Sequence, residues 1–333
     1  MCKGSSANFS VTATGSTPLS YQWYKDNVSI GGATNSTYPI SSTSTSSAAT
    51  YSCIVSNSCG NITSSNIVLT INTAPVITAQ TSTTVSVCSG QSMTFSVTAT
   101  GTAPLSYQWY DGSGAISGAT GNTYTINSVS SSDAGNYYCS VSNSCSPNAT
   151  SSTIVLTVNT APAISAQSTN QTVCSGSAAN FSVTASGSPT PSYQWYYNNS
   201  AISSANNNQY AISSVSSSNA GSYYCIITNS CGATSSTTKA LTVNSAPTIN
   251  SQTGSSVSLC VGQSMTFSVN ATGTAPLSYQ WYNGSGAIGG ASGSNYTINS
   301  ITTSDAGTYY CVVSNSCSPN ATSNNIALTV LTA

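Results

Sequence analysis

The sequence has no histidine, and its charged residues are only lysine and aspartate: three basic and four acidic side chains in 333 residues. General acid–base catalysis recruits histidine, glutamate, aspartate or lysine held in a pocket. We therefore expect no enzyme and assign no catalytic residue. Three lysines cannot neutralise a track of phosphates, so nucleic acid is not an expected partner.

Long hydrophobic runs are also missing. No apolar stretch reaches the roughly twenty residues that a membrane-spanning helix needs, so we expect no membrane span in this segment. No part of the chain gathers the several carboxylates of a calcium module, and no cysteine pair has the close spacing of a thiolate zinc site. We expect neither a metal site nor a cofactor.

The chain does contain a fourfold repetition. Trp23, Trp109, Trp195 and Trp281 follow one another at intervals of 86 residues, and three cysteines per repeat keep that period. Repeat 1 lacks a first strand, and its start at Met1 predicts a mature fragment or a window of a longer repetitive chain. We expect repeat 1 at residues 1–73, repeat 2 at 74–160, repeat 3 at 161–245 and repeat 4 at 246–333.

Apolar and polar residues alternate in short segments. In repeat 2, Met93, Phe95 and Val97 are separated by threonine and serine, which is the period of a half-buried strand. Turns rich in glycine, serine and asparagine separate such segments, as in an all-β sandwich. No helix is expected. The short proline-containing links, such as residues 159–162, restrict swivelling and predict a semi-rigid rod.

Each repeat has a tryptophan on one strand and, further along, a D-x-G-x-Y-x-C run or a variant of it. In repeat 2 these are Trp109 and the run from Asp133 to Cys139. An immunoglobulin-type sandwich requires this pattern. The chain resembles the immunoglobulin superfamily, most closely the tandem I-set-like repeats of bacterial secreted and cell-surface adhesins and fibres. The resemblance implies four antiparallel β-sandwiches whose core contains Trp23, Trp109, Trp195, Trp281, Tyr51, Tyr137, Tyr223, Tyr309, Cys53, Cys139, Cys225 and Cys311.

The cysteines depart from the family pattern. The partner position of Cys139 on strand B is Val97, so the usual bridge across the core cannot form, and we expect Cys139 to be a small buried apolar group. Cys88 and Cys145 are expected at opposite ends of one domain, whereas a disulfide needs Cα atoms within about 7 Å. Our hypothesis is a head-to-tail pairing between repeats: Cys2–Cys145, Cys88–Cys231 and Cys174–Cys317.

Cys59 and Cys260 are left over in that scheme, and each would pair with a neighbouring domain outside this segment or with another subunit. The alternative is that two of the three cysteines of each repeat bond within a domain of altered topology. Either way, twelve regularly spaced cysteines without histidine or glutamate indicate disulfides and an oxidising compartment. We therefore expect an extracellular or cell-surface location.

The surface residues are uncharged and rich in hydroxyl and amide groups, which suits a protein that associates or one coated with sugar; drift towards an inexpensive extracellular composition is the alternative. Sequons such as the one at Asn61 are weak signals in so asparagine- and serine-rich a chain. Tyr110, Tyr138, Tyr196 and Tyr224 have the opposite parity to the core tyrosines. They form either a stripe for carbohydrate or protein contact or a packing surface.

The leading functional hypothesis is structural. We expect a segment of an extracellular fibre or adhesin stalk that is stiffened by disulfides and self-associates into a homopolymer. The edge left by the missing first strand could accept a strand from another chain, unless the sequence is merely truncated. The alternative is a recognition module that binds surface glycans or proteins through the B–C and F–G loops, residues 98–106 and 142–151 in repeat 2. The near identity of the B–C loops in repeats 1, 2 and 4 speaks against dedicated recognition.

Overall fold

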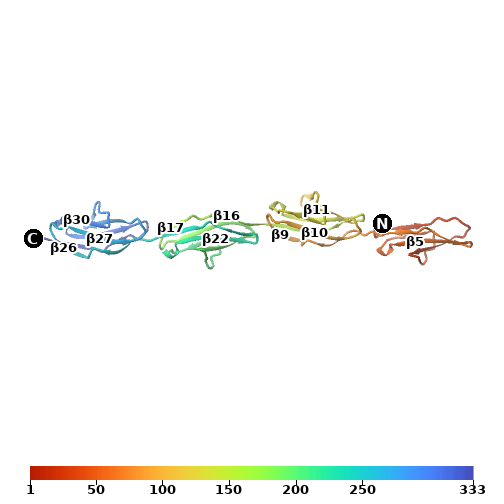
Figure 1. Ribbon diagram of the computed structural model, residues 1–333, viewed down its shortest axis with the longest axis horizontal. Helices are drawn as coiled ribbons and strands as arrows, with labels where there is room; N and C mark the ends of the chain where they lie inside the picture. The colour runs from red at the N-terminus through yellow and green to blue at the C-terminus, as the bar shows by residue number, and fades with distance from the viewer. Residues whose placement is uncertain (333) are drawn as a thin grey trace. The chain divides into compact units, whose positions relative to one another are not determined.

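The structure is a computed structural model that describes residues 1–332 and divides into two compact units, Met1–Thr160 and Ala161–Ala333. Each unit contains two β-sandwiches that follow one another along the chain (Figure 1). Four single 3-10 turns are the only helical elements within residues 1–332, so the expectation of no helix missed these turns. None of the described helical turns has the length and apolarity to cross a membrane.

Repeat 2 is a complete two-sheet sandwich. One sheet has the strand order β13-β10-β8, and β12, β11, β14 and β16 follow one another in the other. The first strand of the fold is split: β8 pairs with β10 in the first sheet, whereas β9 runs parallel to β16 in the second. The elements are β8 (Val76–Gln80), β9 (Thr84–Cys88), β10 (Met93–Thr100), β11 (Ser106–Asp111), β12 (Gly114–Ala115), β13 (Thr123–Ile126), η2 (Ser131–Asp133), β14 (Gly135–Ser142), β15 (Ala149–Thr150) and β16 (Ile154–Gln167).

The core of repeat 2 lies between these sheets. Phe95 and Val97 are buried on the inner face of β10, while the threonine and serine between them face solvent, as the alternation predicts. Phe95 stacks on Tyr137 with ring centroids 4.5 Å apart. Trp109 is completely buried, and its indole N–H donates to the Gly121 carbonyl at 3.1 Å, so that its polar atom is satisfied.

Repeats 3 and 4 follow the same plan. Parallel pairing of β17 with β24 and of β26 with β33 repeats the β9–β16 contact. Repeat 3 contains the second part of β16, then β17 (Gln171–Cys174), β18 (Ala179–Ser188), β19 (Ser192–Tyr197), β20 (Ser200–Ala201), β21 (Gln209–Ile212), η3 (Ser217–Asn219), β22 (Gly221–Asn229), β23 (Gly232–Ser235) and β24 (Lys239–Asn244). Repeat 4 contains β25 (Thr248–Gln252), β26 (Ser256–Cys260), β27 (Met265–Thr272), β28 (Ser278–Asn283), β29 (Gly286–Ala287), β30 (Asn295–Ile298), η4 (Thr303–Asp305), β31 (Gly307–Ser314), β32 (Ala321–Thr322) and β33 (Ile326–Leu331).

Repeat 1 has no counterpart of β8 among its described strands. Its β1 pairs with β4 alone, whereas β10 of repeat 2 pairs on both sides. Val11 is consequently half-buried, while the equivalent Val97 is 2% exposed. The elements are β1 (Ala7–Ser10), β2 (Ser20–Lys25), β3 (Val28–Ser29), β4 (Thr37–Ile40), η1 (Thr45–Ser47), β5 (Ala49–Asn57), β6 (Gly60–Thr63) and β7 (Ile67–Leu69).

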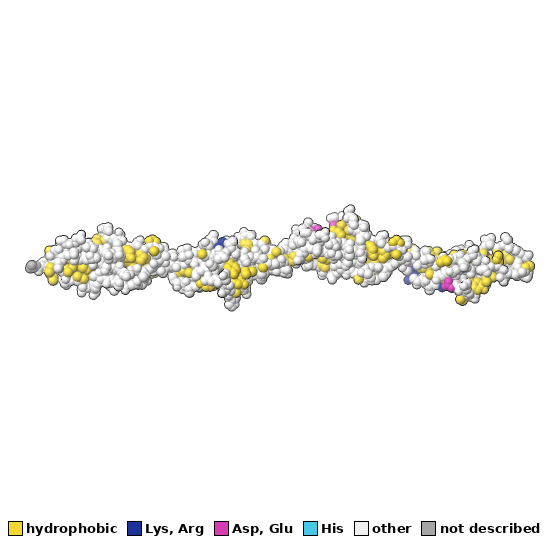
Figure 2. Space-filling model, viewed as in Figure 1, with side chains coloured by type: hydrophobic (Ala, Val, Ile, Leu, Met, Phe, Trp, Pro, Cys, Tyr) yellow, Lys and Arg dark blue, Asp and Glu magenta, His cyan; other side chains and the backbone are white. Residues whose placement is uncertain are grey.

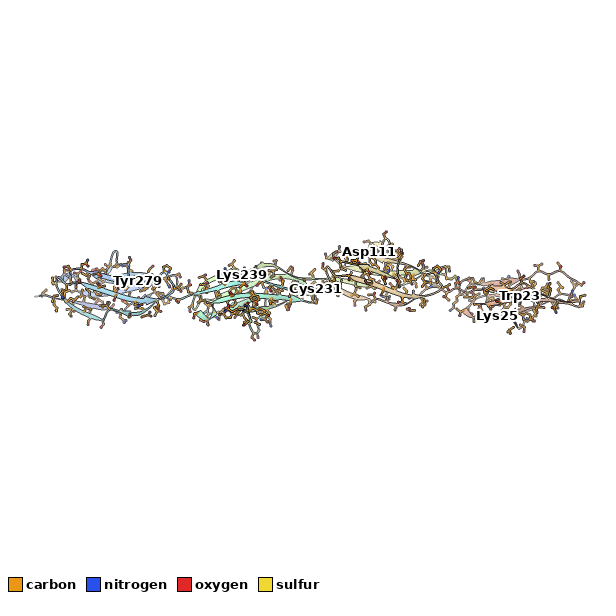
Figure 3. All side chains as sticks on the ribbon, viewed as in Figure 1. Trp23, Lys25, Asp111, Cys231, Lys239 and Tyr279 are labelled. Carbon is orange, nitrogen blue, oxygen red and sulfur yellow. A yellow bond between two sulfur atoms is a disulfide. The ribbon has the colours of Figure 1, made fainter. Side chains whose placement is uncertain are left out.

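The surface carries almost no charge. On the face drawn in Figure 2, charged side chains are few and hydrophobic side chains are scattered among polar ones. Lys25, Asp111 and Lys239, labelled in Figure 3, belong to strands β2, β11 and β24. Within residues 1–332, no three histidine, cysteine, aspartate or glutamate side chains lie together in a way that could hold a metal ion.

Candidate functional site

The turn before the tyrosine of each repeat is a hydrogen-bonded corner. In repeat 2 the Tyr137 hydroxyl donates to the Asp133 carbonyl at 2.8 Å. The Asp133 carboxylate in turn accepts from the Ser130 backbone N–H at 2.8 Å and the Ser130 hydroxyl at 2.7 Å. These two hydrogen bonds hold the pKa of Asp133 below its usual range. Asp133 therefore caps the η2 turn.

The same corner forms without a carboxylate. Asn219 accepts from the Ser216 backbone N–H at 2.8 Å in repeat 3, and Ser47 does the same for Ser44 at 3.0 Å in repeat 1. Asp305 fills the position in repeat 4. Because a serine or an asparagine replaces the aspartate, the corner has a structural role and needs no acid.

The predicted core residues lie together in four separate clusters, one per repeat. The tryptophans are at most 2% exposed and the tyrosines at most 5%. The cysteines of this set are fully buried and free. Burial raises the pKa of Cys225 and Cys311 to about 11, which keeps these thiols protonated and unreactive near neutral pH.

Two disulfides join consecutive repeats. In the first unit Cys2 of repeat 1 bonds to Cys145 of repeat 2, with Cα atoms 5.6 Å apart. In the second unit Cys174 of repeat 3 bonds to Cys317 of repeat 4, again with a Cα separation of 5.6 Å. Cys88 and Cys231 are also half-cystines, and their pairing with each other stays a prediction. We call each bond between consecutive repeats a staple.

The linker beside the Cys2–Cys145 staple is held by the loops of repeat 2. The Thr73 backbone N–H donates to the Thr102 hydroxyl at 2.8 Å, and the Thr102 N–H donates back to the Thr73 carbonyl at 3.1 Å. Asn143 adds two hydrogen bonds, one from its amide nitrogen to each of the Thr73 and Thr102 carbonyls, both at 2.8 Å. Its side-chain oxygen accepts from the Cys145 N–H at 2.9 Å. One asparagine therefore connects the linker, the loop and the staple.

The linker also approaches Gly101 closely. A Cβ on Gly101 would lie 3.0 Å from the Pro75 Cα and 3.2 Å from the Ala74 carbonyl oxygen. The φ angle of Gly101 is +147°, a conformation that other residues rarely adopt. A glycine is thus required at this point of contact. We call the linker-binding contacts of Gly101, Thr102 and Asn143 the clamp.

The second unit repeats this geometry. Asn315 donates to the Ser245 and Thr274 carbonyls at 2.8 Å each, and the Ser245 N–H donates to the Thr274 hydroxyl at 2.8 Å. A Cβ on Gly273 would lie 3.0 Å from the Pro247 Cα. Two independent junctions with the same partners show that the clamp belongs to the repeat itself.

The clamp occupies the loops expected to recognise ligands. Thr102 lies in the predicted B–C loop and Asn143 in the F–G loop of repeat 2, and both contact the linker. Sequence reasoning missed Asn143 as a functional residue, although an Asn-Ser-Cys tripeptide recurs at positions 57, 143, 229 and 315. That recurrence was the signal that could have identified it.

The tyrosines of opposite parity form cross-strand pairs. Tyr110 stacks on Tyr138 with centroids 4.8 Å apart and rings nearly parallel, and Tyr196 stacks on Tyr224 at 5.0 Å. All four are half-buried. In each pair, one face of each ring packs against the partner ring, as in other cross-strand aromatic pairs.

Comparisons with known proteins agree with this architecture. A family model described as an immunoglobulin domain matches residues 1–57, 74–143, 161–229 and 246–315. Human hemicentin-1 is 28% identical over 91% of this chain and 6% of its own length, and Drosophila melanogaster neuroglian is 28% identical over 62% of this chain and 17% of its own length. This chain thus spans only a small part of these relatives. Both are animal proteins, so they lend no support to a bacterial source.

A solved three-domain fragment of titin from the I-band has the same fold, with a TM-score of 0.64 and 21% identity over 78% of this chain and 99% of the fragment. The buried tryptophan, the tyrosine corner and the two-sheet topology occur in all four repeats. The chain belongs to the immunoglobulin-domain family as four tandem immunoglobulin domains.

Proposed function

We propose that this chain is a load-bearing stalk segment of an extracellular or cell-surface adhesion protein or fibre. The staples support the proposal. Each one bridges residues 143 positions apart, so that most of the two repeats it joins lies inside a closed covalent loop. A relative that is 30% identical over 49% of this chain is named as cell adhesion molecule-related, from Xenopus laevis. Disulfides persist in oxidising compartments, which favours a location outside the cell.

A staple changes the path that a pulling force follows. Force applied at the two ends of the first unit passes from Cys2 through the sulfur atoms to Cys145, and the residues between them carry little load. Even if both domains unfold, the residues between Cys2 and Cys145 add no length to the chain while the staple is intact. The segment limits extension without depending on the strength of individual hydrogen bonds.

The clamp adds stiffness at small displacements. Asn143 and Thr102 hold the linker by hydrogen bonds whose partners come from two different loops, and no glycine-rich tether lies between the repeats. A short proline-containing link of this kind resists swivelling. The staple and the clamp therefore act at different scales, one against large extension and the other against bending.

Force spectroscopy of the whole chain tests this function. A fully extended chain spans about 3.6 Å per residue, so reduction of the Cys2–Cys145 staple should add roughly 500 Å of contour length, since it releases 143 residues. The double variant Cys2→Ser with Cys145→Ser should show that added length without a reductant. The matched control is Cys53→Ser, which changes a buried free thiol and leaves the staple in place. Equal contour lengths before and after reduction would refute the load-bearing role.

The recognition alternative has a specific obstacle in this geometry. In repeats 2 and 4 the B–C and F–G loops contact the linker through Thr102, Asn143, Thr274 and Asn315. A ligand at these loops would have to displace the clamp. Glycan or protein binding by the faces of the sheets, where the stacked tyrosine pairs lie, is the form of recognition that remains compatible with the stalk.

A further inference from the structure

A buried free thiol precedes one half of each staple by a short stretch of chain. Cys139 lies six residues before the half-cystine Cys145, and Cys311 lies six residues before Cys317. Both Cys139 and Cys311 are free and completely buried. Each of these two staples therefore has a thiol that is close to it in sequence.

The fold keeps this thiol and the staple apart. In repeat 2, Cys139 lies on β14 opposite Trp109 and belongs to the core cluster. Cys145 lies in the loop beyond the end of that strand, between the paired residues Val141 and Ala149. The three residues from Cys139 to the end of β14 alone span about 10 Å, whereas a disulfide needs Cα atoms within about 7 Å. The folded repeat therefore excludes a bond between Cys139 and Cys145.

Burial suppresses the reactivity of the thiol and shields the staple. Removal from water raises the pKa of Cys139 above its usual range, and a thiol attacks a disulfide only as its thiolate. Cys145 is 2% exposed, so small thiols in solution have little access to its sulfur. Both barriers depend on the fold of repeat 2, and both disappear when this repeat unfolds.

Repeat 4 has the same arrangement. Cys311 lies opposite Trp281 in the core, and Cys317 lies in the loop between the paired residues Val313 and Ala321. Cys317 is also 2% exposed. Because two staples in separate units share this placement of thiol and half-cystine, it belongs to the repeat itself.

We propose that unfolding of repeat 2 opens the staple that this repeat helps to form. When repeat 2 unfolds, the Cys139 sulfur attacks the Cys145 sulfur, and Cys2 is released. The same exchange in repeat 4 starts from Cys311 and releases Cys174. The consequence for extension rests on the proposed stalk function, whereas the exchange itself does not.

The exchange takes place within one chain and needs neither an oxidant nor a reductant. The Cys139 thiol loses its proton to water, and the thiolate forms a bond to the Cys145 sulfur. The bond between Cys145 and Cys2 breaks, and the Cys2 sulfur leaves with the electron pair and takes up a proton. One disulfide and one thiol are present before and after the step.

Chain connectivity determines the direction of the exchange. The staple joins residues 143 positions apart, whereas the new bond joins residues six positions apart. The entropic cost of closing a loop grows with its length, so the short loop is favoured in the unfolded repeat. A pulling force also draws Cys2 away, which prevents the reverse reaction. Because β14 cannot re-form with Cys139 bonded to Cys145, the staple limits extension only while repeat 2 is folded.

Unfolding of the full chain in urea, without added thiol, tests the proposal. Samples taken over time are quenched in acid, denatured and alkylated with a maleimide, and peptic peptides are identified by mass spectrometry. In native buffer the label should be on Cys139 and absent from Cys2. In urea Cys2 should become labelled, and Cys139 should lose its label as it enters a disulfide with Cys145.

The variant Cys139→Ala removes the nucleophile and keeps a small apolar side chain in the core. It should lower the rate of Cys2 release in urea at least about tenfold, because effective concentration falls steeply with the length of the intervening chain. Cys53→Ala is the matched control, since Cys53 is an equally buried free thiol inside the same covalent loop. It lies 51 residues from Cys2 and 92 from Cys145, so its loss should change the rate less than about twofold.

Release in native buffer should depend on rare openings of repeat 2. Tyr137→Phe, which removes the corner hydrogen bond, should speed the release of Cys2 roughly fivefold. Tyr138→Phe keeps the stacked ring and should leave the rate unchanged. Equal release from the wild type and Cys139→Ala in urea, or release that is as fast in the native chain as in the unfolded one, would overturn the inference.

The two proposals fail separately. If added reductant lengthens the chain under force but unfolding without reductant never releases Cys2, only the exchange is wrong. If the bond between Cys139 and Cys145 forms in urea but the contour length does not respond to reduction, the stalk function is wrong and the exchange stands.

Discussion

Tyr137 connects strand β14 to the turn before it through a single hydroxyl. Replacement by phenylalanine removes the 2.8 Å hydrogen bond to the Asp133 carbonyl and keeps the buried ring. We expect Tyr137→Phe to destabilise repeat 2 by about 1 kcal/mol, the net contribution of such a hydrogen bond. Hydrogen exchange of the β14 amides, measured by mass spectrometry, should quicken roughly fivefold.

Tyr138 provides the matched control for that substitution. It is adjacent in sequence, points to the opposite face and stacks on Tyr110 at 4.8 Å. Tyr138→Phe keeps the stacked ring and should leave the exchange rate of β14 unchanged. Equal acceleration in both variants would mean that the corner hydrogen bond contributes nothing specific.

The buried tyrosines also make the free energy of unfolding depend on pH in alkaline solution. Burial, reinforced by the negative charge of Asp133, raises the pKa of Tyr137 to about 12, and burial likewise raises that of Tyr223 to about 12, from an ordinary value of 10.0. Between these values the unfolded chain releases protons that the folded chain keeps, so the free energy of unfolding falls as the pH rises. This stabilisation is complete below pH 10 and is lost towards pH 12.

Spectrophotometric titration with parallel circular dichroism checks this prediction. Tyr137 and Tyr223 should ionise only well above pH 10, in the same transition in which the sheets unfold. Ionisation of these two tyrosines near pH 10 in a chain that stays folded would contradict the prediction.

At the scale of single residues, the core was predictable and the clamp was not. Trp109 and Tyr137 belong to a motif whose chemistry demands burial, and period-two alternation placed Phe95 and Val97 on the inner face. Asn143 is marked in the sequence only by the recurrence of its Asn-Ser-Cys tripeptide, which does not identify its two acceptors, 41 and 70 residues away. Hydrogen bonds between distant loops depend on tertiary geometry that no pattern of one segment contains.

At the scale of elements, the linker and the loop that receives it form the most constrained contact. Gly101→Ala would place a Cβ 3.0 Å from the Pro75 Cα in a backbone conformation with φ of +147°. We expect a loss of about 1–3 kcal/mol in the stability of this contact, the usual size of such backbone strain. Hydrogen exchange of peptides that contain residues 73–76 should become faster.

Gly112 offers the control, since a Cβ there would meet nothing within 4 Å. Gly112→Ala should leave the linker peptides unchanged. If both variants protect the linker equally well, the close approach at Gly101 does not stabilise the junction.

The elements themselves were largely predictable, with instructive exceptions. Strand β10 lies where the alternation of Met93, Phe95 and Val97 placed it, and the motif residues Trp109 and Tyr137 lie on β11 and β14. The 3-10 turns were missed, although a serine three residues before Asp133 is a capping signal. Each turn is three residues long, shorter than any window in which a helical period can be recognised.

At the scale of the whole molecule, the near absence of charge determines how the chain responds to its surroundings. The formal net charge is −1, and 2% of the residues are charged. The clamp contacts are hydrogen bonds between neutral groups. The junction between consecutive repeats should therefore be insensitive to ionic strength, because there are few charges to screen.

Salt distinguishes a neutral junction between repeats from one held by charge. The Debye length falls from about 30 Å at 0.01 M salt to 3 Å at 1 M, so a junction held by charge would weaken many-fold over that range. We expect the hydrogen-exchange rate of peptides that contain residues 73–76 to change less than about twofold in sodium chloride over the same range. A steep rise of this rate with sodium chloride would instead assign the junction to the few lysines and aspartates, against the neutral hydrogen bonds of the clamp.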